Sequence, residues 1–472
     1  MENITLTIDG KSVSVPPGTS VLEAAKTIGH EVPHYCYHPG LSVAGNCRMC
    51  LVRIDKMPKP VISCKTTVAQ DMVVHTQTDE VKKMQQNIME FLLINHPLDC
   101  PTCDQAGECR LQDYYMQYDL IPSRFKEEKV HKDKMVDLGA GVMLDEERCI
   151  VCTRCVRFCQ EVAKVEELQV QNRGDHSMVA TFPGQAMQNP YAGNTVDVCP
   201  VGALTSKDFR YKKRVWFLKK TPSICTGCSK GCNITVEQAD NTVYRFKPRY
   251  NADVNSWWMC DAGRSSYKSI NDNRHLKAQY SQAGELISAS LADTLQHLAT
   301  HLKVTAGKII FVASAQESVE EIDAFVTLAK AANGIVCFSK NDPDNPYSDN
   351  ILIQADKNPN LKHIEALNLK PLADVITQGS HLIVQNSVSH KDLALLKKHN
   401  AKVLCLLASN ISDLDTLAEC ILPTPTFAEQ SGHFINCDGR KQNFEMAFKP
   451  RGEAMLLQQY TAGLMQLLVK QP

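Results

Sequence analysis

Four closely spaced groups of cysteines, one of which includes a histidine, constrain this chain more than any other feature of its sequence. The second group places one histidine and three cysteines within fourteen residues: His96, Cys100, Cys103 and Cys109. Thiols two residues apart can point into one site, and Pro97 ends a helix arriving from upstream, which fixes where His96 points. Taken alone, this quartet is also a zinc-ligand set. The other three groups, whose spacings are not those of zinc fingers, favour iron–sulfur clusters.

Cysteine usage and bulk composition favour bound metal over disulfides. The chain has 472 residues, long enough for three or four domains, and 20 cysteines. Its first residues do not form a signal peptide, and no apolar run approaches the eighteen or more residues of a transmembrane helix. We therefore expect a reducing, cytoplasmic compartment in which the thiols bind metal. The net charge of −1 argues against a role in binding nucleic acid or a membrane surface.

The first group lies in a segment predicted to form a small β-rich domain. Its four cysteines are Cys36, Cys47, Cys50 and Cys64. Alternating apolar residues over 4–8 precede a turn at Asp9, and Val13 and Val15 follow it, which predicts a hairpin. Ser20 with Glu23 predicts the capped start of a helix. A loop of cysteines plus one distant cysteine on a strand is typical of plant-type [2Fe–2S] ferredoxins. A zinc ribbon would need a second C-x2-C pair, which this segment lacks.

The third group has the bacterial ferredoxin spacing C-x2-C-x2-C-x3-C over residues 149–159. In that pattern the fourth cysteine serves a second cluster, and a distant Cys-Pro completes the first. No cysteine occurs between 160 and 198, so Cys159 has no local cluster to serve and is predicted to be structural. The predicted ligands of this [4Fe–4S] cluster are Cys149, Cys152, Cys155 and Cys199.

The fourth group has the spacing C-x2-C-x3-C-x27-C and consists of Cys225, Cys228, Cys232 and Cys260. A four-cysteine zinc site is the alternative to a [4Fe–4S] cluster here. Trp257, Trp258 and Met259 precede the last cysteine and would shield a cluster from water. Shielding matters more for a redox centre than for structural zinc, which favours the cluster.

After about residue 275 the sequence changes to alternating strand and helix patterns. Strands are predicted over 308–313, 335–338, 381–384 and 402–407, and helices over 317–333 and 391–399. This alternation predicts a parallel α/β sheet, and it contains no phosphate-binding glycine motif. Cys337, Cys405 and Cys420 fall in apolar segments and are predicted to be core residues, whereas Cys437 has no spacing partner. A charged run over 124–134 is predicted to be a solvated connector.

The expected fold class is a multidomain α+β chain followed by an α/β domain. The domains are a β-grasp [2Fe–2S] ferredoxin-like domain over 1–78, a helical domain with the His-ligated [4Fe–4S] cluster over 79–120, a ferredoxin-like [4Fe–4S] domain over 138–215, a further [4Fe–4S] domain over 218–274 and the α/β domain over 275–472. Together they account for one [2Fe–2S] and three [4Fe–4S] clusters, or about fourteen iron atoms.

These groups, in this order, resemble those of the large iron–sulfur subunit of bacterial NADH:quinone oxidoreductase, respiratory complex I. The resemblance covers residues 1 to about 270, and its most specific marker is the quartet that begins at His96. It implies a [4Fe–4S] cluster with one histidine ligand there, a [2Fe–2S] cluster at the first quartet and a [4Fe–4S] cluster of the main electron path at the third. The fourth quartet resembles an off-path [4Fe–4S] site that molybdopterin oxidoreductases also carry.

The resemblance also implies a role and partners. As a subunit of a proton-translocating NADH dehydrogenase, the chain would relay electrons from NADH and FMN on a partner flavoprotein subunit. They would pass to a ferredoxin-like [4Fe–4S] subunit and the quinone-site subunits. The chain would contain no catalytic residue and no membrane span, and it would lie peripherally at the cytoplasmic face of the bacterial inner membrane.

The C-terminal part departs from this pattern. The segment from Cys420 to Arg440 is similar to part of the molybdopterin oxidoreductases, yet the chain stops about two hundred residues after its last cluster cysteine. A shortened domain without molybdopterin is therefore expected. The alternatives are an electron-transfer subunit of an NAD-linked hydrogenase, a molybdenum formate dehydrogenase, and a zinc-bearing scaffold without a redox role.

Overall fold

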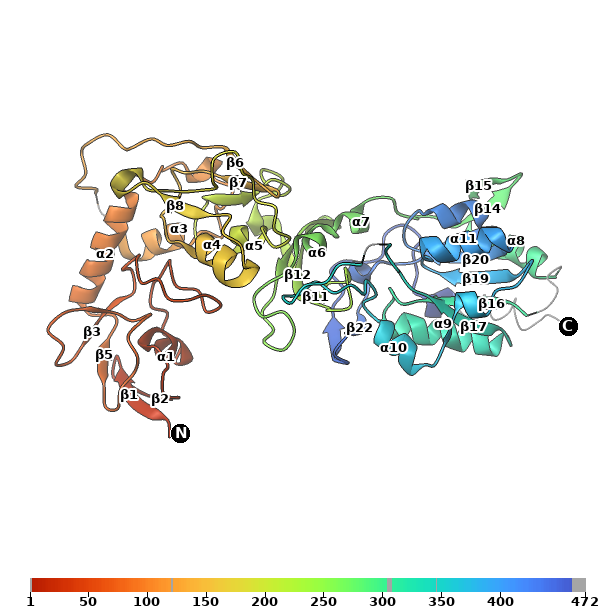
Figure 1. The fold of residues 1–472 in the computed structure, drawn as a ribbon, viewed down its shortest axis with the longest axis horizontal. Coiled ribbons are helices and arrows are strands. Elements are labelled where there is room, and N and C mark those ends of the chain that lie inside the picture. Colours follow the sequence, from red (N-terminus) through yellow and green to blue (C-terminus); the bar gives the residue numbers. More distant parts are fainter. Residues whose placement is uncertain (1, 120–121, 304–307, 345, 461–472) are drawn as a thin grey trace. The chain divides into compact units, whose positions relative to one another are not determined.

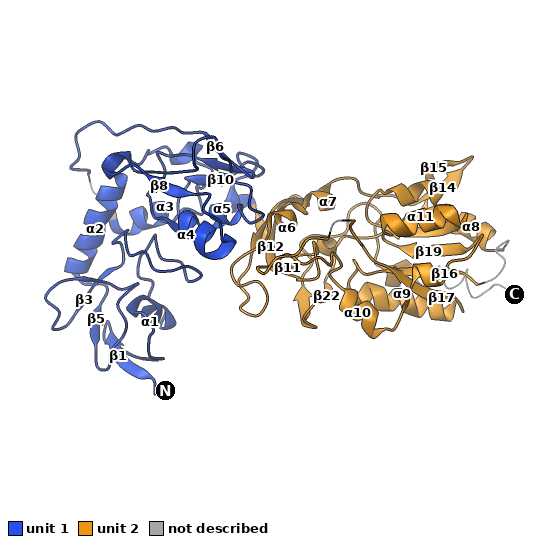
Figure 2. Ribbon diagram, in the orientation of Figure 1, with its two compact units in different colours: residues 1–217 blue, residues 218–472 orange. Residues whose placement is uncertain are grey.

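The computed structural model describes residues 2–119, 122–303, 308–344 and 346–460. Figure 1 shows its ribbon, and Figure 2 its division into two compact units, residues 1–217 and residues 218–472. The expected domain end at 120 and the last residues, 461–472, lie outside the described residues. Within the described ranges, no helix has both the length and the apolar character needed to cross a membrane.

Unit 1 begins with a five-stranded sheet of order β2-β1-β5-β3-β4. Its strands are β1 (Ile4–Ile8), β2 (Lys11–Val15), β3 (Leu51–Ile54), β4 (Val61–Ile62) and β5 (Val73–His75). The antiparallel pairing of β1 with β2 confirms the predicted hairpin. Helix α1 (Val21–Thr27) begins at the predicted cap, where the Ser20 hydroxyl accepts a hydrogen bond from the Glu23 amide at 3.2 Å. Its apolar face packs against the alternating buried residues of β1 and β2.

Helix α2 (Asp79–Leu93) follows this sheet and leads to the second quartet. It begins at Thr78, whose hydroxyl accepts a hydrogen bond from the Val81 amide at 3.3 Å. The helix buries Val81, Gln85 and Met89 and ends shortly before His96, as the sequence predicts. Short elements then carry the cysteines: the 3-10 turn η1 (Cys100–Thr102), α3 (Arg110–Tyr114) and the π-helical turn η2 (Tyr115–Asp119).

The connector over 124–134 is largely exposed, as the sequence predicts, but it also makes contacts that the sequence does not predict. The Lys129 ammonium group donates to two carbonyls at the end of α2, at 2.7 Å each. Lys134 pairs with Asp99 at 3.3 Å and with Glu147 at 2.6 Å. The connector therefore joins α2 and the residues next to the second and third quartets, because its cations meet acceptors that are distant in sequence.

The rest of unit 1 surrounds the third quartet. A three-stranded sheet has the order β10-β7-β6, and a two-stranded sheet pairs β8 with β9. These strands are β6 (Val136–Gly139), β7 (Val142–Leu144), β8 (Gln169–Gln171), β9 (Met178–Ala180) and β10 (Leu204–Ser206). The helical segments are α4 (Arg154–Phe158), the π-helical turn η3 (Cys159–Ala163), the 3-10 turns η4 (Gly174–His176) and η5 (Val215–Phe217), and α5 (Asn194–Val198).

Unit 2 opens with an antiparallel sheet of β11 (Lys219–Ile224), β12 (Asn233–Ala239) and β13 (Thr242–Pro248), followed by α6 (Asp261–Ser265) and α7 (Lys268–Asn271). Its larger sheet has eight strands in the order β15-β14-β21-β20-β19-β16-β17-β18. They are β14 (Gln279–Gln282), β15 (Glu285–Ser288), β16 (Ile310–Ser314), β17 (Ile335–Ser339), β18 (Lys370–Pro371), β19 (His381–Gln385), β20 (Lys402–Ala408) and β21 (Cys420–Pro423).

The larger sheet is parallel from β21 to β18, and β14 and β15 pair antiparallel at its other edge. Its helices are α8 (Leu291–Lys303), α9 (Val319–Ala331), α10 (Leu361–Ala366) and α11 (His390–Lys398). Helices α9 and α11 lie on opposite faces, as Figure 1 shows, so both faces of the sheet are buried. Cys337, Cys405 and Cys420 are each 0 % exposed, which confirms them as core residues.

The chain between and beyond these strands adds 3-10 turns and one hairpin. The turns are η6 (Leu372–Asp374), η7 (Asp413–Leu417) and η8 (Phe427–Glu429), and the hairpin consists of β22 (Gly432–Ile435) and β23 (Lys441–Phe444). Phe434 and Phe444 stack with ring centroids 4.9 Å apart and pack on Ile224 at the end of β11. The segment after β21 is thereby tied to the small sheet next to the fourth quartet.

Candidate metal centres

The structure brings the first quartet together in the loops next to β3 and β4 of the N-terminal sheet. The Cys36 amide donates to the Cys47 sulfur at 3.5 Å. A hydrogen bond from the Cys47 thiol lowers the pKa of Cys36 to about 5, and one from the Cys64 thiol lowers the pKa of Cys50 to about 7. Cys64 also interacts electrostatically with the other three cysteines. The four thiols therefore face one another.

Cys64 does not lie on a strand, contrary to expectation. Strand β4 ends at Ile62, and Cys64 lies in the turn that follows. The Ser63 amide and hydroxyl both donate to the Cys50 carbonyl at 2.9 Å, which holds this turn against the C-x2-C pair. Gly45 has a φ of +66°, and a β-carbon there would lie 2.8 Å from the Ile62 side chain. The left-handed φ favours glycine at this position of the loop, and its small size lets the loop lie close to β4.

The second quartet lines one cavity of about 230 Å³, to which His96, Cys100, Cys103 and Cys109 all contribute. Leu93, Leu111 and Tyr115 supply apolar walls, and Arg148 a cation. The Nδ1 atom of His96 is buried and, within the described residues, has no hydrogen-bond partner. Burial lowers the pKa of His96 to about 4, so the imidazole is neutral at physiological pH. A neutral imidazole with an unsatisfied buried nitrogen is the form that binds a metal.

Two glycines shape this cavity. Gly107 has a φ of +87°, and a β-carbon there would lie 2.8 Å from the Trp216 ring. A β-carbon at Gly202 would collide with the Cys103 sulfur. Gly202 belongs to the segment that follows Cys199, and the Arg110 amide donates to the Pro200 carbonyl at 3.2 Å. The second and third quartets therefore adjoin through residues 199–202.

The third quartet lines a smaller cavity of about 20 Å³, bordered by Cys149, Cys152, Cys155 and Cys199. Val151 and Thr153, which separate the first three cysteines, have φ values of 48° and 61°. This left-handed backbone is uncommon for β-branched residues and curls the segment around the cavity. Cys159 lies on η3, is 0 % exposed and is not among the described residues that line the cavity.

Two buried arginines of α4 connect the third quartet to the first. Arg157 donates to the Cys36 carbonyl at 2.6 Å and to the Cys152 carbonyl at 3.3 Å. Arg154 donates to the Val198 carbonyl at 3.2 Å and also to the Tyr37 carbonyl. Sequence reasoning missed both residues, because nothing in the C-x2-C pattern marks the side chains between the ligands.

The fourth quartet lies at the end of the small sheet in unit 2. The Cys225 amide donates to the Cys232 carbonyl at 2.8 Å, which closes the loop between β11 and β12. Cys260 is the N-cap residue of α6, and its sulfur accepts a hydrogen bond from the Gly263 amide at 3.3 Å. A β-carbon at Gly263 would lie 2.9 Å from the Cys225 sulfur. Cys232 interacts electrostatically with the other three cysteines, so this quartet is also brought together.

Two of the three residues predicted to shield this quartet are buried, and one further cysteine lies beside it. Trp258 and Met259 are buried, at 7 % and 1 % exposure. Cys437, which has no partner by sequence spacing, interacts electrostatically with Cys228. Its amide donates to the Ser229 carbonyl at 2.8 Å, so the segment between β22 and β23 packs on the ligand loop. Only the tertiary fold could reveal this neighbour.

The donor sets fit thiolate-bound metal clusters. The thiols of three or four cysteines converge at the second, third and fourth quartets. Once deprotonated, such groups of buried thiols need a nearby cation, which a bound metal supplies. In a packed core the buried His96 nitrogen would have a hydrogen-bond partner and no cavity would lie beside it. The unsatisfied nitrogen and the cavity therefore fit a site for a bulky bound group.

Comparison with known families gives four matches in the predicted order. Residues 1–79 match a 2Fe-2S iron-sulfur cluster binding domain, and residues 85–124 match the NADH-ubiquinone oxidoreductase-G iron-sulfur binding region. Residues 139–205 match the ferredoxin-like domain of NADH-quinone oxidoreductase subunit 3. Residues 218–272 match the molybdopterin oxidoreductase Fe4S4 domain. These matches confirm the order of the cluster domains and the presence of both cluster types.

The similar proteins are described as subunits of NADH-quinone oxidoreductase or NADH dehydrogenase. The G subunit of NADH-quinone oxidoreductase from Rickettsia conorii is 42% identical over 327 residues, or 69% of this chain and 48% of the relative. The same subunit from Streptomyces coelicolor is 39% identical over 333 residues, which are 70% of this chain and 40% of the relative. The mitochondrial NADH dehydrogenase [ubiquinone] iron-sulfur protein 1 of Solanum tuberosum is 45% identical over 273 residues, which are 57% of this chain and 37% of the relative.

A crystal structure of an NAD+-reducing [NiFe]-hydrogenase in the H2-reduced state covers 45% of this chain and 91% of its own, with 27% identity and a TM-score of 0.41. The chain spans about half the length of the curated relatives it matches. By its ordered cluster domains and its identity to these relatives, the chain belongs to the family of NADH-quinone oxidoreductase G subunits.

Proposed function

We propose that this chain is the iron–sulfur electron-transfer subunit of a respiratory NADH:quinone oxidoreductase. The cavity shared by His96 and three cysteines, next to the Cys199 segment of the third quartet, is the observation that carries this proposal. Electrons enter from NADH through FMN on a partner flavoprotein subunit and leave towards a ferredoxin-like [4Fe–4S] subunit and the quinone-site subunits. The assembly lies at the cytoplasmic face of a bacterial inner membrane.

The proposed ligands are those of the four quartets. Cys36, Cys47, Cys50 and Cys64 hold a [2Fe–2S] cluster, and three [4Fe–4S] clusters are held by His96 with Cys100, Cys103 and Cys109, by Cys149, Cys152, Cys155 and Cys199, and by Cys225, Cys228, Cys232 and Cys260. When bound, the clusters supply one-electron carriers. The domain limits proposed for them are 1–78, 79–120, 138–215 and 218–274, with an α/β domain over 275–472.

The chain's own residues position and tune these carriers. Because electron transfer weakens steeply with distance, the centres must be held close together, and Gly202 and Arg157 join neighbouring ligand segments within unit 1. Reduction potential depends on ligand charge, hydrogen bonds to sulfur and solvent exposure. Neutral His96 in place of a thiolate removes one negative charge, which favours reduction. The Gly263 amide provides a hydrogen bond to sulfur at the fourth quartet.

Anaerobic reduction of the purified chain, with and without its flavoprotein partner, tests the proposal. We expect about fourteen iron atoms per chain and EPR signals that NADH elicits only when the partner is present. Co-purification with a nickel–iron subunit, and reduction of the clusters by hydrogen gas only in its presence, would indicate a hydrogenase subunit instead. A content near four zinc ions would indicate a scaffold, and stoichiometric molybdenum a formate dehydrogenase.

A further inference from the structure

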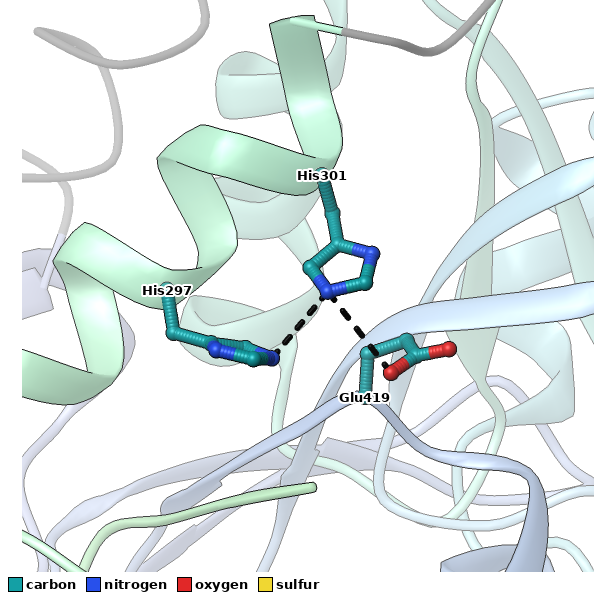
Figure 3. A group of neighbouring side chains, drawn as sticks. All are labelled: His297, His301 and Glu419. Atoms are coloured by element: carbon teal, nitrogen blue, oxygen red, sulfur yellow. Dashed lines mark hydrogen bonds and ion pairs between the residues drawn. The ribbon is translucent and has the colours of Figure 1, made fainter. Parts of the chain in front are cut away.

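A different set of metal-ligand side chains lies in unit 2, outside the four cysteine groups. His297 and His301 lie four residues apart on α8, so their imidazoles project from the same face of the helix. Glu419 immediately precedes β21 and points towards them, as Figure 3 shows. We propose that these three side chains bind one Zn²⁺ ion, with water as the fourth ligand.

The distances between the ligand atoms fit a single ion. The Nε2 atoms of the two histidines are 3.1 Å apart, and the Nε2 of His301 lies 3.8 Å from a carboxylate oxygen of Glu419 (Figure 3). One ligand atom from each residue lies within 4.8 Å of the others. Ligand atoms around a tetrahedral zinc, at about 2.0–2.1 Å from the metal, are separated by roughly 3.3 Å. Little movement is needed to close the site on an ion.

The three side chains meet at one atom. The Nε2 of His301 is the atom that faces both His297 and Glu419. It carries at most one hydrogen and can donate to only one of them. At 3.8 Å the contact with Glu419 is longer than a hydrogen bond. A cation at this point would serve all three groups at once.

The surrounding structure holds the ligands before any ion binds. The Glu419 amide donates to the Val403 carbonyl and its carbonyl accepts from the Ser281 amide, both at 2.8 Å. The ring of Tyr280 stacks on His297 with centroids 4.5 Å apart and planes 24° apart. Glu419 is thus anchored by its backbone on both sides and His297 by its ring, which lowers the cost of ordering them on binding.

Ligand type and exposure favour zinc over the harder cations. Two imidazoles and one carboxylate suit zinc and its transition-metal neighbours, whereas magnesium and calcium prefer all-oxygen sites. The side chains of His301 and Glu419 are 31% and 27% exposed, so solvent reaches the site and water can complete the coordination. A bound ion would join α8 to the start of β21.

The test uses the full chain with its clusters loaded, so that the cysteines are occupied. Zn²⁺ alone is titrated in and the bound ion is characterised by zinc X-ray absorption. We expect one added zinc with nitrogen and oxygen ligands at about 2.0–2.1 Å and no sulfur at about 2.3 Å. His301→Gln and Glu419→Gln should each weaken zinc binding at least about tenfold. His390→Ala, at an exposed histidine of α11, is the matched control and should leave binding unchanged.

Two results would overturn the site: equal zinc uptake by the wild type and both glutamine variants, or added zinc with sulfur ligands only. Glutamine preserves the approximate size of each side chain, and melting without zinc checks that the variants fold. If His301→Gln lowers the melting temperature of the zinc-free chain, the zinc binding of Glu419→Gln, compared with that of the wild type, tests the site instead. Zinc should raise the melting temperature of the wild type but not of Glu419→Gln, because a ligand that binds only the native state stabilises it.

Discussion

The Arg157 guanidinium group donates a hydrogen bond to the backbone carbonyl of Cys36 at 2.6 Å, linking α4 to the loop of the first quartet. The same group also donates to the Cys152 carbonyl at 3.3 Å, and Arg157 is only 8% exposed. One buried cation thus holds the ligand segments of two proposed centres, and it places positive charge beside both.

Replacing Arg157 should affect both centres at once. Arg157→Gln removes the charge and leaves buried carbonyls unpaired, which costs about 1–3 kcal/mol for each group. Loss of a nearby positive charge makes reduction harder, so the potentials of the first and third centres should both fall in an EPR redox titration. Arg157→Lys keeps the charge and should shift them less. Arg173→Gln, at an exposed arginine, is the control; equal potentials in Arg157→Gln and the wild type would contradict this role.

His96 is predicted to ligate the cluster of the second quartet. His96→Cys should preserve a cluster and lower its potential, because the thiolate adds a negative charge. His96→Ala should leave the cluster labile or reduced to three irons and slow electron flow from NADH to quinone in the assembled complex. EPR and iron content measure the state of the cluster, and NADH-to-quinone turnover measures the electron flow. Intact signals with full electron flow in His96→Ala would show that the imidazole only fills space.

Cys159 and Cys155 should respond differently to the same substitution. Cys155 lines the cavity of the third quartet, whereas Cys159 lies on η3 and is not among the described residues of that lining. Cys159→Ser should keep every EPR signal, although it places a hydroxyl in a fully buried position and should lower stability by about 1–3 kcal/mol. Cys155→Ser should abolish or convert one signal. Loss of a cluster in Cys159→Ser would mean that the ligand assignment is wrong.

Glu321 should make unit 2 less stable as pH rises. Burial raises its pKa from 4.5 to about 7, and its carboxylate accepts a hydrogen bond from the Leu457 amide at 3.1 Å. The folded chain therefore holds an extra proton between these values, and stability is lost as pH rises from about 4.5 to about 7. Glu321→Gln keeps an acceptor for Leu457 and should gain up to about 3 kcal/mol over the wild type at pH 8, but not at pH 4.

Calorimetric melting of unit 2 within the full chain at both pH values measures this difference. Glu365→Gln, at a carboxylate that is 52% exposed, is the control and should leave the pH dependence unchanged. The same loss of stability between pH 4 and pH 8 in Glu321→Gln and the wild type would contradict the prediction.

Local patterns were sufficient for several elements and for the closely spaced ligands, but not for the strand expected at Cys64. The hairpin β1–β2, the capped start of α1 and the strand–helix alternation after residue 275 depend on contacts within a few residues. Cysteines two or three residues apart likewise share a site because of chain geometry alone. The contacts of the connector over 124–134 were missed for the opposite reason: Asp99 and Glu147, which pair with Lys134, come from other segments.

The sequence by itself therefore determined which residues form the four cysteine quartets, the order of the cluster domains and the periodic elements of both units. Only the tertiary structure decided what surrounds the ligands: Gly202 against the Cys103 sulfur, Arg157 between two quartets and Cys437 beside the fourth. His297 and His301 are visible as a pair in the sequence, but Glu419 lies far along the chain. Contacts of this kind form when the chain packs, and no local spacing encodes them.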